Sequence, residues 1–538
     1  MKAYKILAEA LVEQGAHTMF GVMGDANMQI IAHYKDVAGG RYLGATHEAG
    51  AIEMADGFHR ISGEIGFATA THGPGFTNTL TALTEAGRNR SQLVVITGDT
   101  PPERTWTQAL DIGAAVAPTG AGYERVYRLD SIEADLARAI QRATIERRPV
   151  VLNFPYALMQ QETDPHPIKP SPPLVQLPPR PDDSAYERAL DLIAGADRPL
   201  VLAGRGAARS NAREEIIAFA DALGAPLSTS LLGRDLFAGH PLNLGIVGSL
   251  GHSIALDAIG QADVIIAFGA GLNRYTTDRG DLFKGKRVLQ VDTSAENVGI
   301  FLRVDELLLG DAKEVAATLT GYLKEAEFEP SGWAQRFAPR LAEWTPESEF
   351  DDKSANGAVD VRSAVIALDR VLPKDRIVVS DVGRFLVAAW RYLSVEWPLR
   401  FTHTSTFGSI GLGLGTALGA AVADPSRLTV GIMGDGGFMM SGLELSTAAR
   451  YKLPILVVVV NDGAYGAEYT KLKNHGEDPK HSLVEWPELG PLAEAMGART
   501  LTVRSLEDFG RVPALIDGLE GPAFVDVRLD PLADVGHW

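Results

Sequence analysis

The sequence has 538 residues, of which 46% are hydrophobic and 22% charged, so length and composition predict a globular protein of three or four domains rather than a disordered chain. It contains no cysteine, which excludes disulfides, thiolate metal sites and a cysteine nucleophile. The net charge of −18, without a basic patch, argues against nucleic acid or an anionic membrane as a partner.

The first residues, MKAYKILAEALVEQG, predict an amphipathic helix. We expect neither a signal peptide nor a membrane-spanning segment, and therefore a cytoplasmic enzyme. Two stretches are typical of linkers: residues 161–183, which hold eight prolines, and residues 325–358, where polar segments flank a short helical piece. The predicted domains are residues 1–165, 184–325 and 355–538.

Each domain alternates short apolar runs with amphipathic segments of helical period. Runs that are apolar on both faces and bounded by turns are typical of parallel strands covered by helices on both sides. We therefore predict an α/β fold of three doubly wound parallel-sheet domains. The predicted strands include Leu93–Thr97, Val150–Phe154, Pro199–Ala203, Asp263–Phe268, Arg287–Val291, Arg376–Val379, Leu428–Met433 and Ile455–Val460.

The strongest chemical signal lies in the third domain, where two strands end in polar residues. The first runs into Gly434-Asp435-Gly436-Gly437 ahead of a helix predicted over Phe438–Tyr451, and the next ends at Asn461-Asp462-Gly463. Glycines at the start of a helix suit a phosphate group, and the two aspartates offer the oxygen ligands that Mg²⁺ prefers. GDGG alone would more often be a tight turn, but the second polar strand end, 27 residues on, favours a binding site.

These residues resemble the metal–diphosphate signature of the thiamine diphosphate enzymes of the acetolactate synthase and pyruvate decarboxylase superfamily. The resemblance implies a pyrimidine-binding first domain, a central domain and a diphosphate-binding third domain. It also implies an active site between two subunits, hence a homodimer at minimum, with a homotetramer favoured. Further segments that match in family order are FGVMGDANMQ (20–29), ATHEAGAIEMADGFHR (45–60), ATHGPGFTN (70–78), SDVGRF (380–385) and FGSIGLGLGTALGAA (407–421).

The resemblance implies roles for individual residues. Glu48, which without the family would be taken for a solvated helix residue, would hydrogen-bond N1′ of the aminopyrimidine and promote loss of the thiazolium proton. Asp435, Asp462 and the Ala464 carbonyl would bind Mg²⁺; the second ligand is normally Asn, so Asp462 departs from the family and Asn461 is the alternative. Ile410 would hold the cofactor in its V shape. The other implied cofactor contacts are Val382, Gly383, Phe385, Gly408, Ser409, Gly434, Gly436, Gly437, Tyr465 and Gly466.

Four further residues bear on the reaction. Asp25 and Glu468 lie where pyruvate and indolepyruvate decarboxylases carry catalytic acids, and both are expected to line one cleft. The adjacent His-His of those enzymes is absent, and the loop around Gln108 is closer to acetolactate synthases, although the lysine that follows it there is missing. His72 would face the cofactor as an acid or base, or else bind a backbone carbonyl, and both readings stay open.

Three reactions remain as hypotheses. The favoured one is decarboxylation of a 2-oxo acid, with release of an aldehyde or transfer to an acceptor. An acetolactate synthase-like carboligase and a lyase or hydrolase of a 1,2-diketone are the alternatives. Intact Glu48 and Asp435 argue against an inactive homologue, and no GxGxxG follows a strand as in a dinucleotide-dependent enzyme.

The central domain contains two partial nucleotide-binding signals. Gly204-Arg205-Gly206 follows one strand, and GLNRYTTD (271–278) follows another and only partly matches the flavin motif of acetolactate synthases. We therefore favour a central domain without flavin over one that binds FAD.

Overall fold

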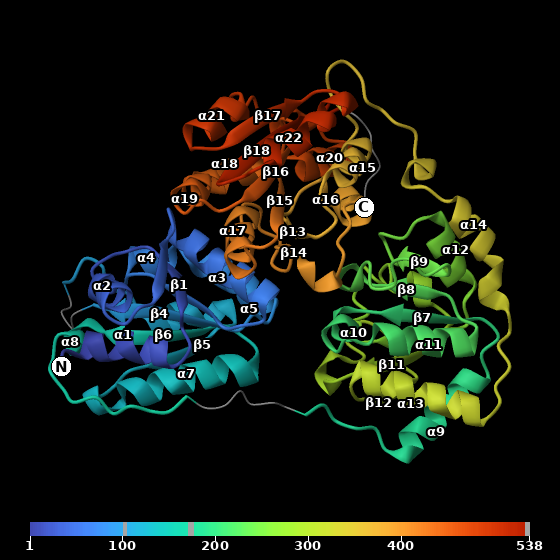
Figure 1. The fold of residues 1–538 in the computed structure, drawn as a ribbon, viewed down its shortest axis with the longest axis horizontal. Helices are drawn as coiled ribbons and strands as arrows, with labels where there is room; N and C mark the ends of the chain where they lie inside the picture. Colours follow the sequence, from blue (N-terminus) through green and yellow to red (C-terminus); the bar gives the residue numbers. More distant parts are fainter. Residues whose placement is uncertain (101–104, 171–176, 533–538) are drawn as a thin grey trace.

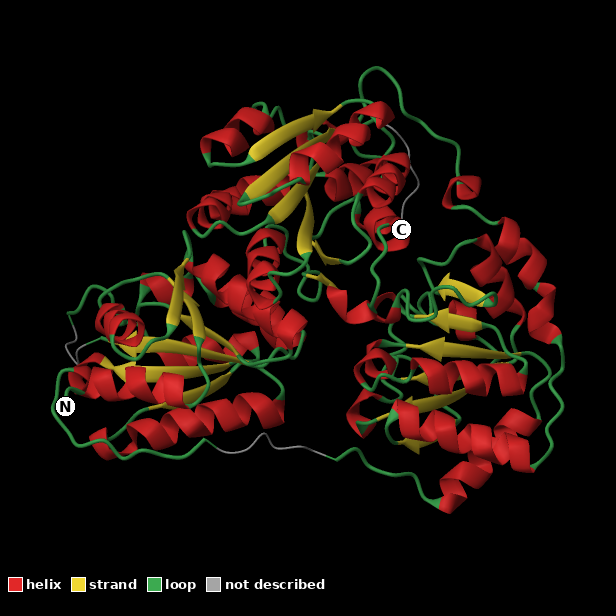
Figure 2. Ribbon diagram, in the orientation of Figure 1, coloured by secondary structure: helices red, strands yellow, loops and turns green. Residues whose placement is uncertain are grey.

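The computed structural model describes residues 1–100, 105–170 and 177–532. It contains three six-stranded sheets, and every strand pairing within them is parallel. Helices cover both faces of each sheet (Figures 1 and 2). The predicted fold class, three doubly wound parallel-sheet domains, is confirmed.

The first sheet has the strand order β2-β1-β3-β4-β6-β5. Its strands are β1 (Thr18–Gly21), β2 (Arg41–Gly44), β3 (Gly66–Thr69), β4 (Leu93–Asp99), β5 (Gly122–Arg125) and β6 (Val150–Pro155). The helices around it are α1 (Ala3–Glu13), α2 (Met28–Asp36), α3 (Glu48–Ser62), α4 (Pro74–Thr77), α5 (Leu80–Arg88), α6 (Ile112–Val116), α7 (Ile132–Glu146) and α8 (Tyr156–Met159).

The central sheet has the order β12-β11-β10-β7-β8-β9. Its strands are β7 (Pro199–Ala203), β8 (Leu227–Thr229), β9 (Asn243–Ile246), β10 (Val264–Phe268), β11 (Arg287–Asp292) and β12 (Glu306–Leu309). Its helices are α9 (Asp183–Ala194), α10 (Arg205–Arg209), α11 (Arg213–Leu223), α12 (Ser253–Gln261) and α13 (Ala312–Glu325), with α14 (Ala338–Glu343) in the connection that follows.

The third sheet has the order β14-β13-β15-β16-β18-β17. Its strands are β13 (Arg376–Ser380), β14 (Phe401–His403), β15 (Leu428–Gly434), β16 (Ile455–Asn461), β17 (Arg499–Val503) and β18 (Pro522–Arg528). Its helices are α15 (Val361–Val371), α16 (Leu386–Tyr392), α17 (Gly413–Ala423), α18 (Asp435–Ser441), α19 (Leu445–Arg450), α20 (Gly466–Asn474), α21 (Leu489–Ala495) and α22 (Val512–Ile516).

The predicted strands are present, with ends that differ by at most two residues. One predicted helix differs: residues 438–451 form the end of α18, a 3₁₀ turn over Gly442–Glu444, and then α19. The break falls at Gly442, where a Cβ would lie 3.1 Å from the ring of Phe438. The first helix also begins earlier than predicted, at Asp435, directly after the strand.

Both predicted linkers connect domains (Figure 1). Residues 163–170 and 177–182 form no helix or strand, and Pro172-Pro173 lie outside the described residues. The second linker contains α14 between two 3₁₀ turns, which is the short helical piece expected there. No helix within the described ranges is long and apolar enough to cross a membrane. The exact domain boundaries stay a prediction.

The first and third domains share one hydrophobic core. On one face of β4, Val95 belongs to a buried cluster that continues into the third domain through Leu414 of α17. Residues on the opposite face of the strand, such as Val94 and Ile96, pack with α1 and α7. Helices α3 and α17 lie side by side at this junction (Figure 1). The relative position of the two domains is therefore fixed by burial of apolar surface.

Glycines allow α3 and α17 to approach closely. A Cβ on Gly57 would lie 1.9 Å from the carbonyl oxygen of Thr416, and one on Gly419 would lie 1.9 Å from that of Met54. We expect Gly57→Ala to lower the free energy of unfolding by about 3 kcal/mol, because the helices must separate. Denaturant unfolding would measure this. Gly260→Ala on α12, where a Cβ meets nothing within 4 Å, should be neutral or stabilising, and equal effects of the two changes would contradict this account.

A buried carboxyl cluster lies at the same junction. Glu53 of α3 is buried, and its Oε2 has no hydrogen-bond partner among the residues that the structure describes. Burial raises the pKa of Glu53 well above the usual value, and Glu444, Asp381 and Asp56 raise it further. The folded state therefore holds a proton that the unfolded chain has lost, and stability falls as pH rises from the ordinary carboxyl pKa to the raised one. We expect Glu53→Gln to gain stability relative to the wild type between pH 5 and pH 8. Unfolding midpoints at both pH values measure it, and a difference independent of pH would refute it.

Candidate active site

The third sheet brings the polar strand ends together. Strand β15 lies between β13 and β16, and Gly434 at its end pairs with Val460 of β16. Asp435 and Asp462 follow these two strands directly, so both lie at the carboxyl edge of the sheet, where ligands of α/β proteins bind. This adjacency was predicted from the spacing of the two motifs.

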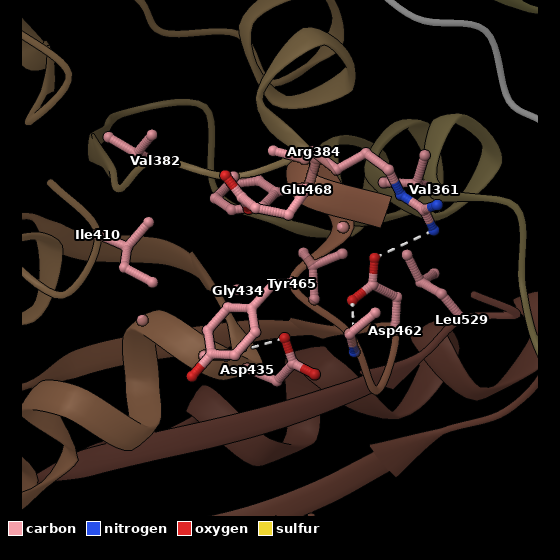
Figure 3. Close-up of a pocket in the computed structure, with 18 of the residues that line it drawn as sticks. Val361, Val382, Arg384, Ile410, Gly434, Asp435, Asp462, Tyr465, Glu468 and Leu529 are labelled. Atoms are coloured by element: carbon pink, nitrogen blue, oxygen red, sulfur yellow. Dashed lines mark hydrogen bonds and ion pairs between the residues drawn. The ribbon is translucent and has the colours of Figure 1, made fainter. Parts of the chain in front are cut away.

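A pocket opens at this edge (Figure 3). Among the described residues that line it, all come from the third domain or its immediate flanks. Most of the cofactor-site residues predicted from the sequence gather here. They are Val382, Gly383, Phe385, Gly408, Ile410, Gly434, Asp435, Gly436, Gly437, Asp462, Ala464, Tyr465, Gly466 and Glu468.

The two aspartates of the pocket are buried, and Asp435 is incompletely hydrogen-bonded. Asp435 is 2% exposed; its Oδ1 accepts the Gly436 N–H at 2.9 Å, whereas its Oδ2 has no hydrogen-bond partner in the described part of the chain. Burial raises its pKa. The pKa of Asp462 is raised to about 7, mainly by burial. The nearby Arg384 opposes this increase, and the charge of Asp435 adds to it. Oδ1 of Asp462 accepts the N–H of Ala464 at 3.2 Å.

This donor set fits Mg²⁺. The described residues contain no group of three or more His, Asp or Glu side chains that could hold a metal. Two carboxylates and the carbonyl of Ala464 would instead leave room for diphosphate oxygens, and all of these are hard oxygen ligands. The unpartnered Oδ2 of Asp435 is the observation that favours a cation here, because a buried carboxylate oxygen without a partner is costly.

The glycines of the same loop are packed closely by protein side chains. A Cβ on Gly436 would lie 3.0 Å from the ring of Tyr465, and one on Gly437 would lie 2.6 Å from Oδ2 of Asp381. Asp381 itself is fully buried and accepts the Gly411 N–H at 2.8 Å. It thereby holds the segment that carries Ile410 against the pocket (Figure 3). The residues present thus fit a diphosphate and its metal.

Ser409 and Glu468 lie differently from the buried residues. Ser409 does not line the pocket, and its hydroxyl donates to the carbonyl of Ile410 at 3.1 Å. Glu468 lies in the first turn of α20 and lines the pocket, with its side chain 58% exposed and 3.4 Å from Lys471. Its carboxylate is therefore accessible to a small molecule in the pocket.

The remaining predicted residues gather on the first domain. Glu48 begins α3, which His47 caps, and its Oε2 accepts from Asn78 at 3.0 Å. His72 is buried, with Nε2 2.9 Å from Oε1 of Gln108, and its Nδ1 has no hydrogen-bond partner within the described ranges. His72 therefore contacts a side chain, not the backbone carbonyl that was the alternative.

Within one chain these first-domain residues and the pocket stay apart. Glu48, His72, Gln108 and the exposed Asp25 are not among the residues that line it. The single cleft predicted for Asp25 and Glu468 is thus not formed by one chain alone.

Six lining residues were missed by sequence reasoning: Val361, Arg384, Val460, Ala467, Lys471 and Leu529. Arg384 had the clearest signal, because it stands between two predicted contacts, Gly383 and Phe385. Leu529 follows β18, far along the chain, and its N–H donates to the carbonyl of Asn461 at 2.8 Å. Only the strand order places it beside the pocket.

The glycines of the central domain have a packing role. A Cβ on Gly204 would lie 2.4 Å from the carbonyl oxygen of Gly269, and one on Gly206 would lie 2.7 Å from the Cα of Gly269. The loop after β7 therefore packs on the loop after β10. The expectation that this domain does not bind FAD stays a prediction.

Family comparisons agree with this architecture. Three models match in chain order: the N-terminal TPP binding domain of thiamine pyrophosphate enzymes at residues 1–114, their central domain at 186–319 and their C-terminal TPP binding domain at 381–527. The chain thus belongs to the thiamine pyrophosphate enzyme family.

Individual similar proteins indicate which enzymes of this family the chain is related to. The chain is 30% identical to the sulfoacetaldehyde acetyltransferase of Alcaligenes xylosoxydans xylosoxydans, over 96% of this chain and 90% of that protein. It is 28% identical to a probable acetolactate synthase large subunit of Methanocaldococcus jannaschii, over 99% and 92%. It is 30% identical to the acetolactate synthase large subunit of Parasynechococcus marenigrum, over 97% and 86%. The protein is a thiamine diphosphate-dependent enzyme that is similar to sulfoacetaldehyde acetyltransferases and to acetolactate synthases.

Proposed function

We propose that the protein cleaves the C–C bond beside the ketone of a 2-oxo acid, with thiamine diphosphate and Mg²⁺, and releases an aldehyde or passes the remaining unit to an acceptor. The observation that carries this proposal is one pocket that contains both the Asp435–Asp462 metal site and the accessible carboxylate of Glu468. Thiamine diphosphate, when bound, supplies the nucleophilic carbon and the electron sink that such cleavage requires.

The residues of the third domain have distinct tasks in this proposal. Asp435, Asp462 and the carbonyl of Ala464 hold Mg²⁺. The glycines around Asp435 would bind the diphosphate through their backbone, and Ile410, on the loop that Asp381 fixes, would contact the cofactor. Glu468 delivers or accepts a proton at the reacting carbon.

A second subunit completes the site. Glu48, Asp25, His72 and Gln108 lie on the first domain and do not reach the pocket of their own chain. Apolar side chains on α18, which begins at the pocket, and on the 3₁₀ turn that follows it are exposed in the single chain; they include Met440 at 62% and Leu443 at 67%. Both observations support a homodimer in which the first domain of one subunit covers the third domain of the other, and we expect a homotetramer as the favoured assembly.

Glu468→Gln tests the role of the pocket acid. Without a carboxyl to protonate the reacting carbon, release of aldehyde should slow by about 10- to 100-fold and the ligated fraction of product should rise. Product analysis after turnover of the accepted 2-oxo acid measures both. The matched control is Glu477→Gln, an exposed acid beyond the end of α20. An unchanged product ratio in Glu468→Gln would show that another group protonates the product.

Acyl transfer is the second candidate. The similarity to sulfoacetaldehyde acetyltransferase favours it, since it covers 96% of the chain. In this case the unit left after cleavage passes to an acceptor, and Glu468 must be kept from protonating it first.

Substrate profiling decides between the reactions. The holoenzyme would be given pyruvate, phenylpyruvate, a branched 2-oxo acid, a cyclic 1,2-dione and sulfoacetaldehyde, with CO₂ and organic products both followed. CO₂ with free aldehyde supports the decarboxylase, and CO₂ with a ligated product supports the carboligase. Ring opening of the dione without CO₂, or turnover of sulfoacetaldehyde alone, would overturn the 2-oxo acid proposal.

A further inference from the structure

The metal site carries an excess of negative charge. Asp435 and Asp462 are both buried, and a diphosphate would add further negative charge next to them. One Mg²⁺ balances the two carboxylates and leaves the diphosphate without compensation. Like charges repel strongly where water is excluded, so a second cation is needed for tight binding of the diphosphate.

Arg384 is placed to supply that charge. Its guanidinium lies 3.0 Å from Oδ2 of Asp462, and the two side chains are only 10% and 8% exposed (Figure 3). Lys471 is the other cation among the described lining residues, but its side chain is 69% exposed and contacts Glu468. Exposed cations are screened by solvent, whereas Arg384 is not.

The surroundings of Arg384 hold it in this position. Its NH1 donates to the carbonyl of Pro531 at 3.1 Å. A Cβ on Gly466 would lie 3.0 Å from Cβ and 3.1 Å from Nε of Arg384, so the arginine occupies space that a larger residue at the start of α20 would fill. The ion pair is therefore a built feature of the pocket wall.

We propose that Arg384 is the counter-charge of Asp462 and that the pair acts as an electrically neutral second metal ligand, as an amide side chain would. Arg384 thereby determines the affinity for the metal–diphosphate group through Asp462, and it is a positioning residue. The inference rests on the proposed binding of thiamine diphosphate and Mg²⁺ at this pocket.

A double-mutant cycle tests this proposal, with the Kd of thiamine diphosphate at saturating Mg²⁺ measured by equilibrium dialysis. We expect Arg384→Gln to raise the Kd by on the order of 30-fold, because Asp462 is left unpaired. In the Asp462→Asn background the same change should alter the Kd by less than about threefold. A ratio of tenfold or more between the two effects supports the proposal.

Other outcomes of the double-mutant cycle would overturn the proposal for Arg384. If Arg384→Gln has no effect, or weakens binding equally in both backgrounds, then Arg384 is not the counter-charge of Asp462. If the Arg384→Gln variant fails to fold, the Asp462→Asn variant can still be compared with the Asp462→Asn, Arg384→Gln double variant. Neither of these variants has a carboxylate at position 462 that has lost its arginine. A tenfold difference between their Kd values would refute the proposal.

Controls separate the inference from the proposed function. Arg384→Lys keeps the charge and should bind within about threefold of the wild type. Arg400→Gln removes an arginine that pairs with Asp375 and Glu396 elsewhere in the third domain and should leave the Kd unchanged. Failure of the wild type to bind thiamine diphosphate would refute the proposed function, whereas wild-type binding with additive effects would refute only the role of Arg384.

Discussion

Replacing Glu48 by Gln should abolish turnover of every accepted substrate while thiamine diphosphate still binds. The amide can still hydrogen-bond the cofactor but cannot accept or share a proton, so we expect a loss of at least about 100-fold in kcat. The Kd of the cofactor should stay within about threefold, because the anchoring groups lie on the third domain. Steady-state kinetics and equilibrium dialysis measure the two effects separately.

The control for this change is Glu64→Gln, an exposed acid just beyond the end of α3, which should not alter kcat. The geometry at Glu48 makes the test specific, because Asn78 donates to its Oε2 and can equally approach the oxygen of Gln. Turnover retained in Glu48→Gln would exclude the assigned role of this carboxyl and, with it, the proposed mechanism.

Replacing Asp435 by Ala should abolish binding of Mg²⁺ and thiamine diphosphate together. This residue supplies a carboxylate oxygen that has no hydrogen-bond partner among the described residues, and we expect the cofactor Kd to rise by on the order of 100-fold or more. Because burial of that carboxylate raises its pKa and costs stability, the unfolding midpoint of the cofactor-free variant should equal or exceed that of the wild type. Dialysis and thermal unfolding measure the two effects.

Asp478→Ala is the matched control, since Asp478 is an exposed aspartate of the same domain that pairs with Lys480. It should leave the cofactor Kd unchanged. Normal cofactor binding by Asp435→Ala would remove the metal from this edge of the sheet, whereas a lowered midpoint would ascribe the loss to misfolding.

The two inactive variants together test whether a site is shared between subunits. When Glu48→Gln and Asp435→Ala chains are co-expressed, half of randomly formed dimers are mixed and one of the two sites in each is intact. About a quarter of wild-type turnover should therefore return. No recovery from verified mixed dimers would place Glu48 and Asp435 in the same subunit's site.

Local sequence patterns predicted the third-domain site well because its residues follow strand ends. Parallel strands place their carboxyl ends at one edge, so Asp435 and Asp462 had to meet once β15 and β16 were neighbours. The predicted common cleft of Asp25 and Glu468 requires domains of two subunits to face each other, and it stays a prediction. Periodicity failed at Gly442, where a 3₁₀ turn interrupts the helix predicted over residues 438–451.

The sequence by itself determined the fold class and the cofactor-binding class, because apolar runs and glycine-rich strand ends act over a few residues and survive in any arrangement of the domains. Tertiary structure decided three things: the close crossing of α3 and α17, the separation of Glu48 from its own chain's pocket, and the pairing of Arg384 with Asp462. Each depends on contacts between segments far apart in the chain, and these follow from how the whole molecule packs its apolar surface.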